Sequence, residues 1–363
     1  MKLVVKLGKA IAIALCIIIF SVSVKAEATP VQISMLAQGD AITDPNSLLR
    51  YSLPIENQQV RRLQKDIEEL SQYLRSKRWG PIQSNLKDAY SVTTYGRQAL
   101  LSSVPTEIQP QAEAIAQTIT EQITELQALA GTKDKEKVWE KRGETLNQIT
   151  ELQDLMVQGF PFEVPEEYSN LPQLKGRATV VLETTQGLMT VVVDGYSAPV
   201  NAGNFVDLVQ RGFYNGLNFM RNQSDFVVQF GKPEKEDGFI DPKTKEYRAI
   251  PLEYLIKGDP LPTYGLTIED AGIYLADLAL PFSAYGTLAL ARPENDPNGG
   301  SSQVFFFKFD NEITPPGFNL MDGRYSVFGY LVEGKEILGN LTPEDKIISA
   351  KVVQGLENLV QPT

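Results

Sequence analysis

The sequence predicts a multidomain α plus β protein, in which an N-terminal helical bundle is followed by an antiparallel β-barrel. Three observations lead to this prediction. Apolar residues recur every three or four positions before residue 160, short β-branched runs replace that pattern after residue 175, and prolines crowd the stretch between them. The length of 363 residues also suits two domains and a targeting segment better than one core.

The first 26 residues have the three parts of a secretory signal peptide. Three lysines precede an apolar run over residues 10–24, and the small residue Ala26 follows. We expect cleavage after Ala26, which makes 1–26 the signal peptide and 27–45 a flexible N-terminal segment. The alternative is a retained membrane anchor. The run is shorter than the roughly 20 residues that a spanning helix needs, so we expect no membrane span after cleavage.

Composition excludes several kinds of site and partner for the exported chain. Cleavage would remove four lysines and no acid, which leaves 30 basic against 45 acidic residues and a net charge of −15. A surface this acidic is a poor partner for nucleic acid or anionic lipid. The chain has no histidine, and its single cysteine, Cys16, lies in the signal peptide. Zinc sites, Ser-His-Asp triads and Cys-His dyads are therefore excluded, and we expect no metal and no cofactor.

Residues 46–160 are predicted as the helical bundle domain, and its first two helices follow from apolar spacing. Over Asn57–Arg78, apolar side chains are three or four residues apart, which is the period of one helical face. They are Val60, Leu63, Ile67, Leu70 and Leu74. The tripeptide "WGP" is expected to break the chain after this helix, and a second helix is expected over Ile82–Leu101.

Two further helices complete the predicted bundle. The third follows Pro105 and has Gly131 as its C-terminal stop, and a charged turn over residues 132–144 leads into the fourth, which ends before Gly159. Four amphipathic helices with short breaks favour an up-and-down bundle. The alternative is that their apolar stripes bind a partner helix.

The sequence pattern changes after the bundle. Residues 161–174 hold three prolines and show no period, so they are predicted as a linker, and 175–363 as the barrel domain. Two β-branched runs around a turn at Gln186-Gly187 predict a hairpin, and a helix is expected in "APVNAGNFVDLVQRG". Four further strands are expected in "GTLALARP", "SQVFFFKF", "YSVFGYLVEG" and "KIISAKVVQG". Short strands between glycine-rich turns favour a closed antiparallel barrel.

Four motifs in one order resemble a known family. They are "APVNAGNFVDLVQRGFYNGLNFMR", "DFVVQFG", "GTLALARPENDPNGGSSQVFFF" and "LMDGRYSVFG". Their order is similar to that of the cyclophilins, which are peptidyl-prolyl cis/trans isomerases, and the resemblance covers about residues 177–360. It implies a cyclophilin-like β-barrel. The signal peptide and the helical domain ahead of it further resemble the large cyclophilins of the thylakoid lumen in plants and cyanobacteria.

An isomerase of this kind must stabilise a twisted amide. Rotation about an X-Pro bond faces a barrier of roughly 18–20 kcal/mol, because the C–N bond has double-bond character. In the twisted state the prolyl nitrogen regains its lone pair, so a cationic donor aimed at that nitrogen binds the transition state selectively. The resemblance assigns this donor to Arg221.

The resemblance also implies the rest of the site. Besides Arg221, the residues that it places in the catalytic centre are Phe226, Gln229 and Phe305. The residues that it places around the bound peptide are Val227, Ala291, Arg292, Gln303, Leu320, Met321 and Tyr325. The large apolar members of these two sets match the family's proline pocket, and the two glutamines match its polar rim.

This chain departs from the family at the rim. The family's usual tryptophan falls on Leu320, its usual histidine falls on Tyr325, and Arg292 stands where an asparagine is common. The segment 232–285 is also much longer than in small cyclophilins. Because Leu320 has no indole N–H to donate, we expect weakened cyclosporin binding and low to modest isomerase activity.

The sequence therefore predicts an exported cyclophilin-type peptidyl-prolyl cis/trans isomerase, in the thylakoid lumen or, as the alternative, in the periplasm. Its expected partners are proline-containing protein segments. The lumenal resemblance implies that these are lumenal loops of photosystem II subunits, which it would help to fold and assemble. Two other interpretations stand beside this one: a proline-loop-binding chaperone or scaffold with little turnover, and a protein whose helical domain is the part that binds partners. A further hypothesis is that the helical domain contacts the site and covers Phe226 and Phe305.

Overall fold

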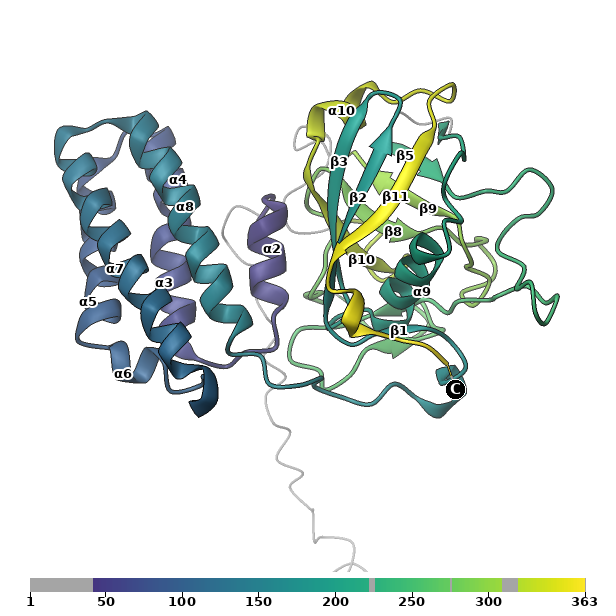
Figure 1. Cartoon of the computed structure of the whole chain (residues 1–363), viewed down its shortest axis with the longest axis horizontal. Coiled ribbons are helices and arrows are strands. Elements are labelled where there is room, and N and C mark those ends of the chain that lie inside the picture. Colours follow the sequence, from purple (N-terminus) through teal and green to yellow (C-terminus); the bar gives the residue numbers. More distant parts are fainter. Residues whose placement is uncertain (1–41, 222–225, 275, 309–318, 363) are drawn as a thin grey trace, which may run out of the picture. The chain divides into compact units, whose positions relative to one another are not determined.

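The computed structural model describes residues 42–221, 226–274, 276–308 and 319–362. The expected signal peptide, and the expected flexible segment up to residue 41, lie outside these residues. Within the described ranges, no helix combines the length and the apolar character needed to cross a bilayer. Helices come first along the chain, and the first strand begins at Gln173, so the order of helical and strand-rich parts is the one predicted (Figure 1).

The helical part is a bundle with an aliphatic core. Its helices are α2 Pro45–Ser52, α3 Gln58–Glu68, α4 Leu70–Arg75, α5 Trp79–Thr94, α6 Arg97–Leu100, α7 Gln109–Thr132 and α8 Lys135–Asp154. A 3-10 turn, Thr106–Ile108, leads into α7. Helices α3, α5, α7 and α8 pack against one another, and their apolar residues, spaced by three and four, form one buried cluster. The predicted bundle is therefore confirmed.

Three details of these helices differ from the prediction. The "WGP" tripeptide begins α5 instead of breaking the chain, because Pro81 falls in the first helical turn, where its missing N–H costs no hydrogen bond. Gly131 is not the C-terminal stop, since α7 runs through it to Thr132, and the next residue, Lys133, adopts the left-handed conformation with φ 58°. The charged segment is largely the first half of α8, where the Asp134 side chain accepts a hydrogen bond from the Lys137 N–H at 3.2 Å.

The strand-rich part is an antiparallel barrel, as predicted. Its main sheet has the order β11-β2-β3-β10-β8-β9-β5-β4, and a bridge between Asn218 and Lys346 joins the chain just before β4 to the chain just before β11. The strands of this sheet are β2 Arg177–Thr184, β3 Gly187–Asp194, β4 Met220–Arg221, β5 Val227–Phe230, β8 Thr287–Leu290, β9 Val304–Phe307, β10 Val327–Glu333 and β11 Ile347–Gln354. The bridge brings the two edges of the sheet together, which closes the barrel.

Smaller elements surround this sheet. They are helices α9 Pro199–Gln210 and α10 Lys335–Asn340, the paired strands β1 Gln173–Leu174 and β12 Leu359–Val360, the paired strands β6 Glu253–Tyr254 and β7 Thr263–Tyr264, and the 3-10 turns Glu166–Tyr168 and Leu356–Asn358. Helix α9 is the one predicted in "APVNAGNFVDLVQRG". Strands β6 and β7 lie within the long segment 232–285, which therefore has secondary structure of its own.

Alternation along the strands divides the sheet into two apolar faces. On the inner face, alternate residues of β5, β8 and β9 join the main core together with residues of α9. These strand residues are Val228, Phe230, Leu288, Leu290, Val304 and Phe306. The residues between them, among them Val227, Ala289, Phe305 and Phe307, belong to a second cluster on the outer face.

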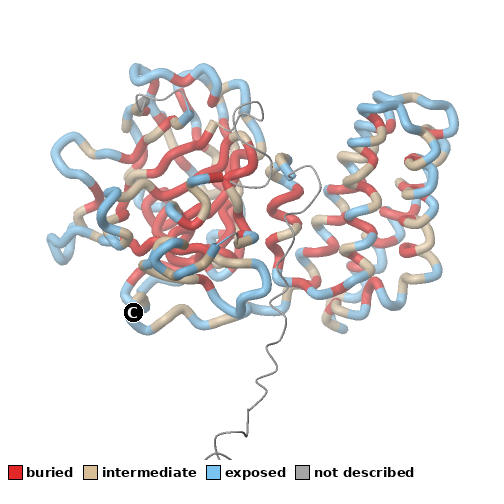
Figure 2. The backbone as a smooth tube through the Cα atoms, turned by 180° about the vertical axis from the view of Figure 1, so that it is seen from behind, coloured by how far each residue is buried: buried red, intermediate tan, exposed pale blue. Residues whose placement is uncertain are grey.

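Helix α2, which the sequence prediction did not separate from the bundle, packs on this outer face. Leu48 and Leu49 are 4% and 5% exposed and lie in the outer cluster, and α2 contacts β10. Figure 2 shows most of α2 as buried. The Arg177 guanidinium donates hydrogen bonds to the Leu49 carbonyl oxygen and, at 3.0 Å, to the buried carboxylate of Asp194. The first helix after residue 44 is thus held by the barrel as well as by its own chain neighbours.

Candidate functional site

Strands β4, β5 and β9 bring the predicted site residues of two motifs onto neighbouring positions. Gln229 of β5 lies opposite Phe305 of β9, and Met220 of β4 lies opposite Gln229 on the other side. Arg221 follows Met220, and its backbone lies opposite Val228, the residue of the inner core that precedes Gln229 in β5. Residues opposite each other in an antiparallel pair share a face. Gln229 and Phe305 therefore share the outer face, with Arg221 on the adjacent strand.

Phe305 belongs to an apolar cluster on this face. We call the part of this cluster around Phe305, Val227, Ala291, Met321 and Tyr325 the hollow, because the resemblance places the family's proline pocket there. The Phe305 ring is 4% exposed, stacks on the ring of Phe282 at 6.1 Å, and meets the ring of Tyr325 edge-on at 5.5 Å and 89°. Three other predicted pocket residues are half-buried in the same cluster, and they are Val227, Ala291 and Met321. An aromatic ring with half-exposed aliphatic neighbours is the kind of surface that a proline ring can contact.

Two predicted residues stand apart from this hollow. Phe226, at the entrance to β5, is 39% exposed, and Leu320 is 69% exposed and is not part of the outer cluster. Leu320 precedes the half-buried Met321 in the loop before β10. The position where the family has a tryptophan therefore offers an exposed aliphatic side chain.

The two predicted rim glutamines form a relay that ends on the long segment 232–285. The Gln229 Nε2 group donates to Gln303 Oε1 at 2.7 Å, and Gln303 Nε2 donates to the carbonyl oxygen of Asp237 at 2.6 Å. These two bonds fix which end of each amide faces which neighbour. In this arrangement Gln303 contacts the Nε2 group of Gln229 and not its Oε1 atom, which is an acceptor.

Arg292 lies against Tyr325 of the hollow. Its guanidinium carbon is 5.3 Å from the centre of the Tyr325 ring, which itself contacts Phe305. Arg292 Nε donates to the Arg324 carbonyl oxygen at 2.8 Å, and Arg292 Nη1 donates to the carbonyl oxygens of Pro293 and Glu294 at 2.8 and 3.0 Å. The side chain is therefore fixed by backbone groups rather than extended into solvent.

The long segment contributes a covering residue that sequence reasoning missed. Phe282 is 1% exposed and contacts both Phe305 and Phe307, the latter edge-on at 5.6 Å. The Phe282 N–H donates to Asp322 Oδ1 at 2.8 Å, and Asn319 Nδ2 donates to the Phe282 carbonyl oxygen at 3.1 Å. Burial raises the pKa of Asp322 to about 6. The apolar run "LALPF" before Ser283 was the available signal for this packing.

A second missed residue, Glu253, joins the same segment to α9. Its buried carboxylate accepts hydrogen bonds from the N–H groups of Val200 and Asn201, at 3.2 and 2.8 Å, and from Asn201 Nδ2 at 2.9 Å. It thereby caps the N-terminus of α9, where Ala198 has no side chain that can do so. Burial raises the pKa of Glu253 to about 7, against the opposing effect of these donors. The sequence signal was that α9 begins after Ala198, which cannot cap a helix, so that a cap from a distant residue was to be expected.

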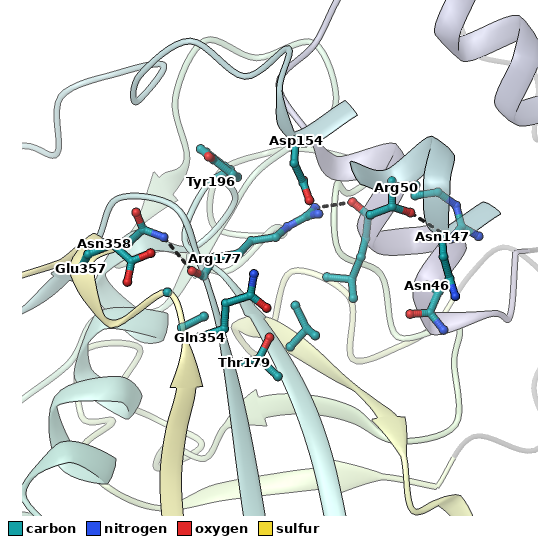
Figure 3. Close-up of a pocket in the computed structure, with 15 residues that line it drawn as sticks. Asn46, Arg50, Asn147, Asp154, Arg177, Thr179, Tyr196, Gln354, Glu357 and Asn358 are labelled. Carbon is teal, nitrogen blue, oxygen red and sulfur yellow. Dashed lines mark hydrogen bonds between the residues drawn. The ribbon is translucent and has the colours of Figure 1, made fainter. Parts of the chain in front are cut away.

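A polar cavity of about 410 Å³ lies apart from the candidate site (Figure 3). It is lined by residues of α2, α8, β2, β3, the turn after β3 and the end of β11 with the chain that follows it, and none of the predicted site residues is among them. Its two arginines, Arg50 and Arg177, already bind the carboxylates of Glu68 at 2.8 Å and Asp194 at 3.0 Å. The cavity therefore adds no catalytic group to the hollow around Phe305.

Two family models match the chain, one in each part. Residues 44–157 match the model described as peptidyl-prolyl cis-trans isomerase CYP38-like, PsbQ-like domain. Residues 179–354 match the model of the cyclophilin-type peptidyl-prolyl cis-trans isomerases.

Relatives extend over most of the chain. A protein of Synechocystis sp., named as a thylakoid lumen peptidyl-prolyl cis-trans isomerase, is 59% identical over 91% of this chain and 88% of its own length. The chloroplastic isomerase CYP38 of Arabidopsis thaliana is 39% identical over 93% of this chain and 80% of its own length. Among solved structures, a cyclophilin of Cryptosporidium parvum is 19% identical with a TM-score of 0.34, over 48% of this chain and 99% of that chain.

Proposed function

Because the chain belongs to the cyclophilin-type peptidyl-prolyl cis-trans isomerases, we propose that it acts in the thylakoid lumen as an isomerase that assists folding and assembly of photosystem II subunits. The isomerase part of this proposal rests on one observation: Val227, Phe305 and Tyr325 lie in one cluster, and the hydrogen-bonded glutamines lie beside it. An apolar hollow with an amide rim suits a proline ring and its flanking carbonyl groups.

The proposed mechanism is selective binding of the twisted amide. The proline ring rests on Phe305 and Val227, the rim glutamines orient the peptide, and Arg221 donates to the prolyl nitrogen once its lone pair is free. That charge-assisted bond is worth about 1.5–3 kcal/mol, or roughly ten- to a hundredfold in rate. No proton is transferred, which agrees with a site that uses neither histidine nor cysteine.

Replacement of Arg221 tests the catalytic part. We expect Arg221→Ala to lower kcat/KM by roughly ten- to a hundredfold, and Arg221→Lys to keep part of the activity, because lysine retains the charge but loses the planar fork. Line-shape or exchange NMR on a proline peptide measures this without a coupling protease. Equal rates for the wild type and Arg221→Ala would refute the assignment.

The lumenal part of the proposal has separate support. The Synechocystis relative carries the thylakoid lumen in its name, and the Arabidopsis relative is named as chloroplastic. An N-terminal sequence of signal-peptide type is the matching feature of this chain. Fractionation followed by co-purification tests it: enrichment with photosystem II assembly intermediates supports the proposal. An even distribution over unrelated exported proteins would contradict it.

A second candidate function is a proline-loop-binding chaperone or scaffold with little turnover, regulated by the helical domain. It is favoured by the 4% exposure of Phe305, whose ring is covered by Phe282, and by the location of α2 in the same outer cluster. Titration of proline peptides by NMR separates the two candidates. Binding at the hollow without acceleration of isomerisation identifies the second, and acceleration that Arg221→Ala removes identifies the first.

A further inference from the structure

Arg292 differs in its charge environment from Arg324, whose backbone it contacts. Arg324 is paired with Glu269, with 2.6 Å between its Nη2 and the carboxylate. The described residues contain no such carboxylate partner for Arg292, whose three hydrogen bonds all go to backbone carbonyl oxygens. Carbonyl groups hold the guanidinium in place but leave its net charge uncompensated.

The position of this charge is fixed relative to Phe305. Arg292 lies 5.3 Å from the Tyr325 ring centre, and Tyr325 lies 5.5 Å from the Phe305 ring centre, so the guanidinium is at most about 11 Å from the Phe305 ring centre. An extended peptide advances about 3.3–3.6 Å per residue. A side chain one or two residues from a proline seated on Phe305 can therefore reach Arg292.

The remaining donor capacity of Arg292 suits a carboxylate. Nη2 carries two N–H groups, and no acceptor for them is found in the part of the chain that the structure describes. Carboxylates are the partners that guanidinium groups bind best in proteins. The chain is acidic overall, with a net charge of −11, and Arg292 adds a local positive charge without a carboxylate partner among the described residues.

We propose that Arg292 is a specificity-determining residue, which selects proline segments that carry Asp or Glu within two residues of the proline. The proposal rests on the isomerase site described above and names its substrate class. The partner is an acidic proline-containing peptide segment, held by its carboxylate at Arg292 while its proline ring lies on Phe305.

The test uses the full chain and a panel of single-proline peptides. Each peptide has Glu, Gln or Lys at one of the four positions within two residues of the proline, and NMR measures both isomerisation and binding. The informative quantity is the ratio of kcat/KM for Glu over Gln at each position. We expect a ratio of about five at one or two positions in the wild type, as for a partly exposed ion pair, and a ratio below one for Lys over Gln.

Three variants decide whether Arg292 causes this ratio. We expect Arg292→Gln to bring the Glu/Gln ratio close to one, and Arg292→Lys to keep part of it, because the charge remains while the stacking on Tyr325 is lost. The matched control is the double variant Arg324→Gln/Glu269→Gln, which removes the neighbouring ion pair without changing the net charge and should leave the ratio unchanged. Raising NaCl to 0.5 M should reduce the wild-type ratio.

The outcomes separate this proposal from the proposed function. A wild-type ratio near one at all four positions, or an unchanged ratio in Arg292→Gln, refutes the role of Arg292 while the isomerase assignment stands. If no peptide is isomerised faster than in buffer, the isomerase assignment fails, and the same ratio taken from dissociation constants then decides the role of Arg292.

Discussion

The two faces of the β5-β9-β8 sheet are built from the same kinds of residue but are covered differently. The inner face packs against α9 and the rest of the barrel, so that Phe306 is fully buried. The outer face is covered by Phe282 and by α2 over only part of its area, and half-exposed residues such as Val227 surround the remainder. Apolar alternation predicts both faces equally well. Coverage by distant segments is what distinguishes the core from a candidate site.

The largest expected effect lies on the inner face. Phe306→Ala removes a ring that is 0% exposed and stacks on Phe230 at 5.7 Å, which should lower the free energy of unfolding by about 3–5 kcal/mol. Urea unfolding measures this loss. Because the ring does not reach the outer face, kcat/KM of the folded fraction should stay close to that of the wild type. A loss of activity in Phe306→Ala without a loss of stability would contradict the assignment of the inner face to the core.

The second effect tests whether the long segment is an integral part of the barrel. The pKa of Glu253 is raised from 4.5 to about 7 in the folded state. Between these two pH values the folded protein keeps a proton on Glu253 that the unfolded chain has lost. The free energy of unfolding therefore falls as pH rises from 4.5 to 7. One group shifted this far contributes on the order of 3 kcal/mol. We expect Glu253→Gln to remove this part of the pH dependence. Urea unfolding at pH 4.5 and 7.5 measures the difference between wild type and variant, and the same slope in both would contradict the role of Glu253.

The smallest effect concerns the open rim of the outer face. Leu320→Trp supplies the indole donor that the family usually has, and one added hydrogen bond is worth about 0.5–1.5 kcal/mol. We expect cyclosporin to bind roughly two- to tenfold more tightly, with stability changed by no more than about 0.5 kcal/mol because Leu320 is 69% exposed. Isothermal titration measures the affinity. An unchanged dissociation constant would show that the indole position is not the missing contact.

The fold could be predicted largely from local patterns. Helical spacing in the bundle and alternation in the strands are properties of short segments, and each segment here buries the face that its own period defines. The errors fall where a local signal has two meanings. Proline breaks the interior of a helix but is tolerated in the first turn, where Pro81 lies in α5. Glycine is common at helix ends but is tolerated inside a long helix, as Gly131 is in α7.

The candidate site could be predicted only in part, for a different physical reason. The four motifs carry the residues of the hollow and of the glutamine relay. Phe282, Glu253 and Leu49 reach the barrel from segments with no such motif, and their contacts join residues far apart in sequence. No local period signals contacts of this kind. The contrast between Arg324, which binds Glu269, and Arg292, which is held by backbone carbonyl groups, was equally hidden, because it depends on such distant contacts.

Paired substitutions on one strand test the central claim most directly, namely that the site is the part of the outer face around Phe305 and Tyr325, while the rest of that face is structural packing. Phe305 and Phe307 lie on β9 with both rings on this face, but Phe305 also contacts Tyr325 of the hollow, whereas Phe307 meets Phe282 edge-on. Both alanine variants should lose stability. For the folded fraction, Phe305→Ala should lower kcat/KM on a proline peptide by about tenfold or more, and Phe307→Ala by less than about threefold. Equal losses of kcat/KM in the two variants would contradict the account.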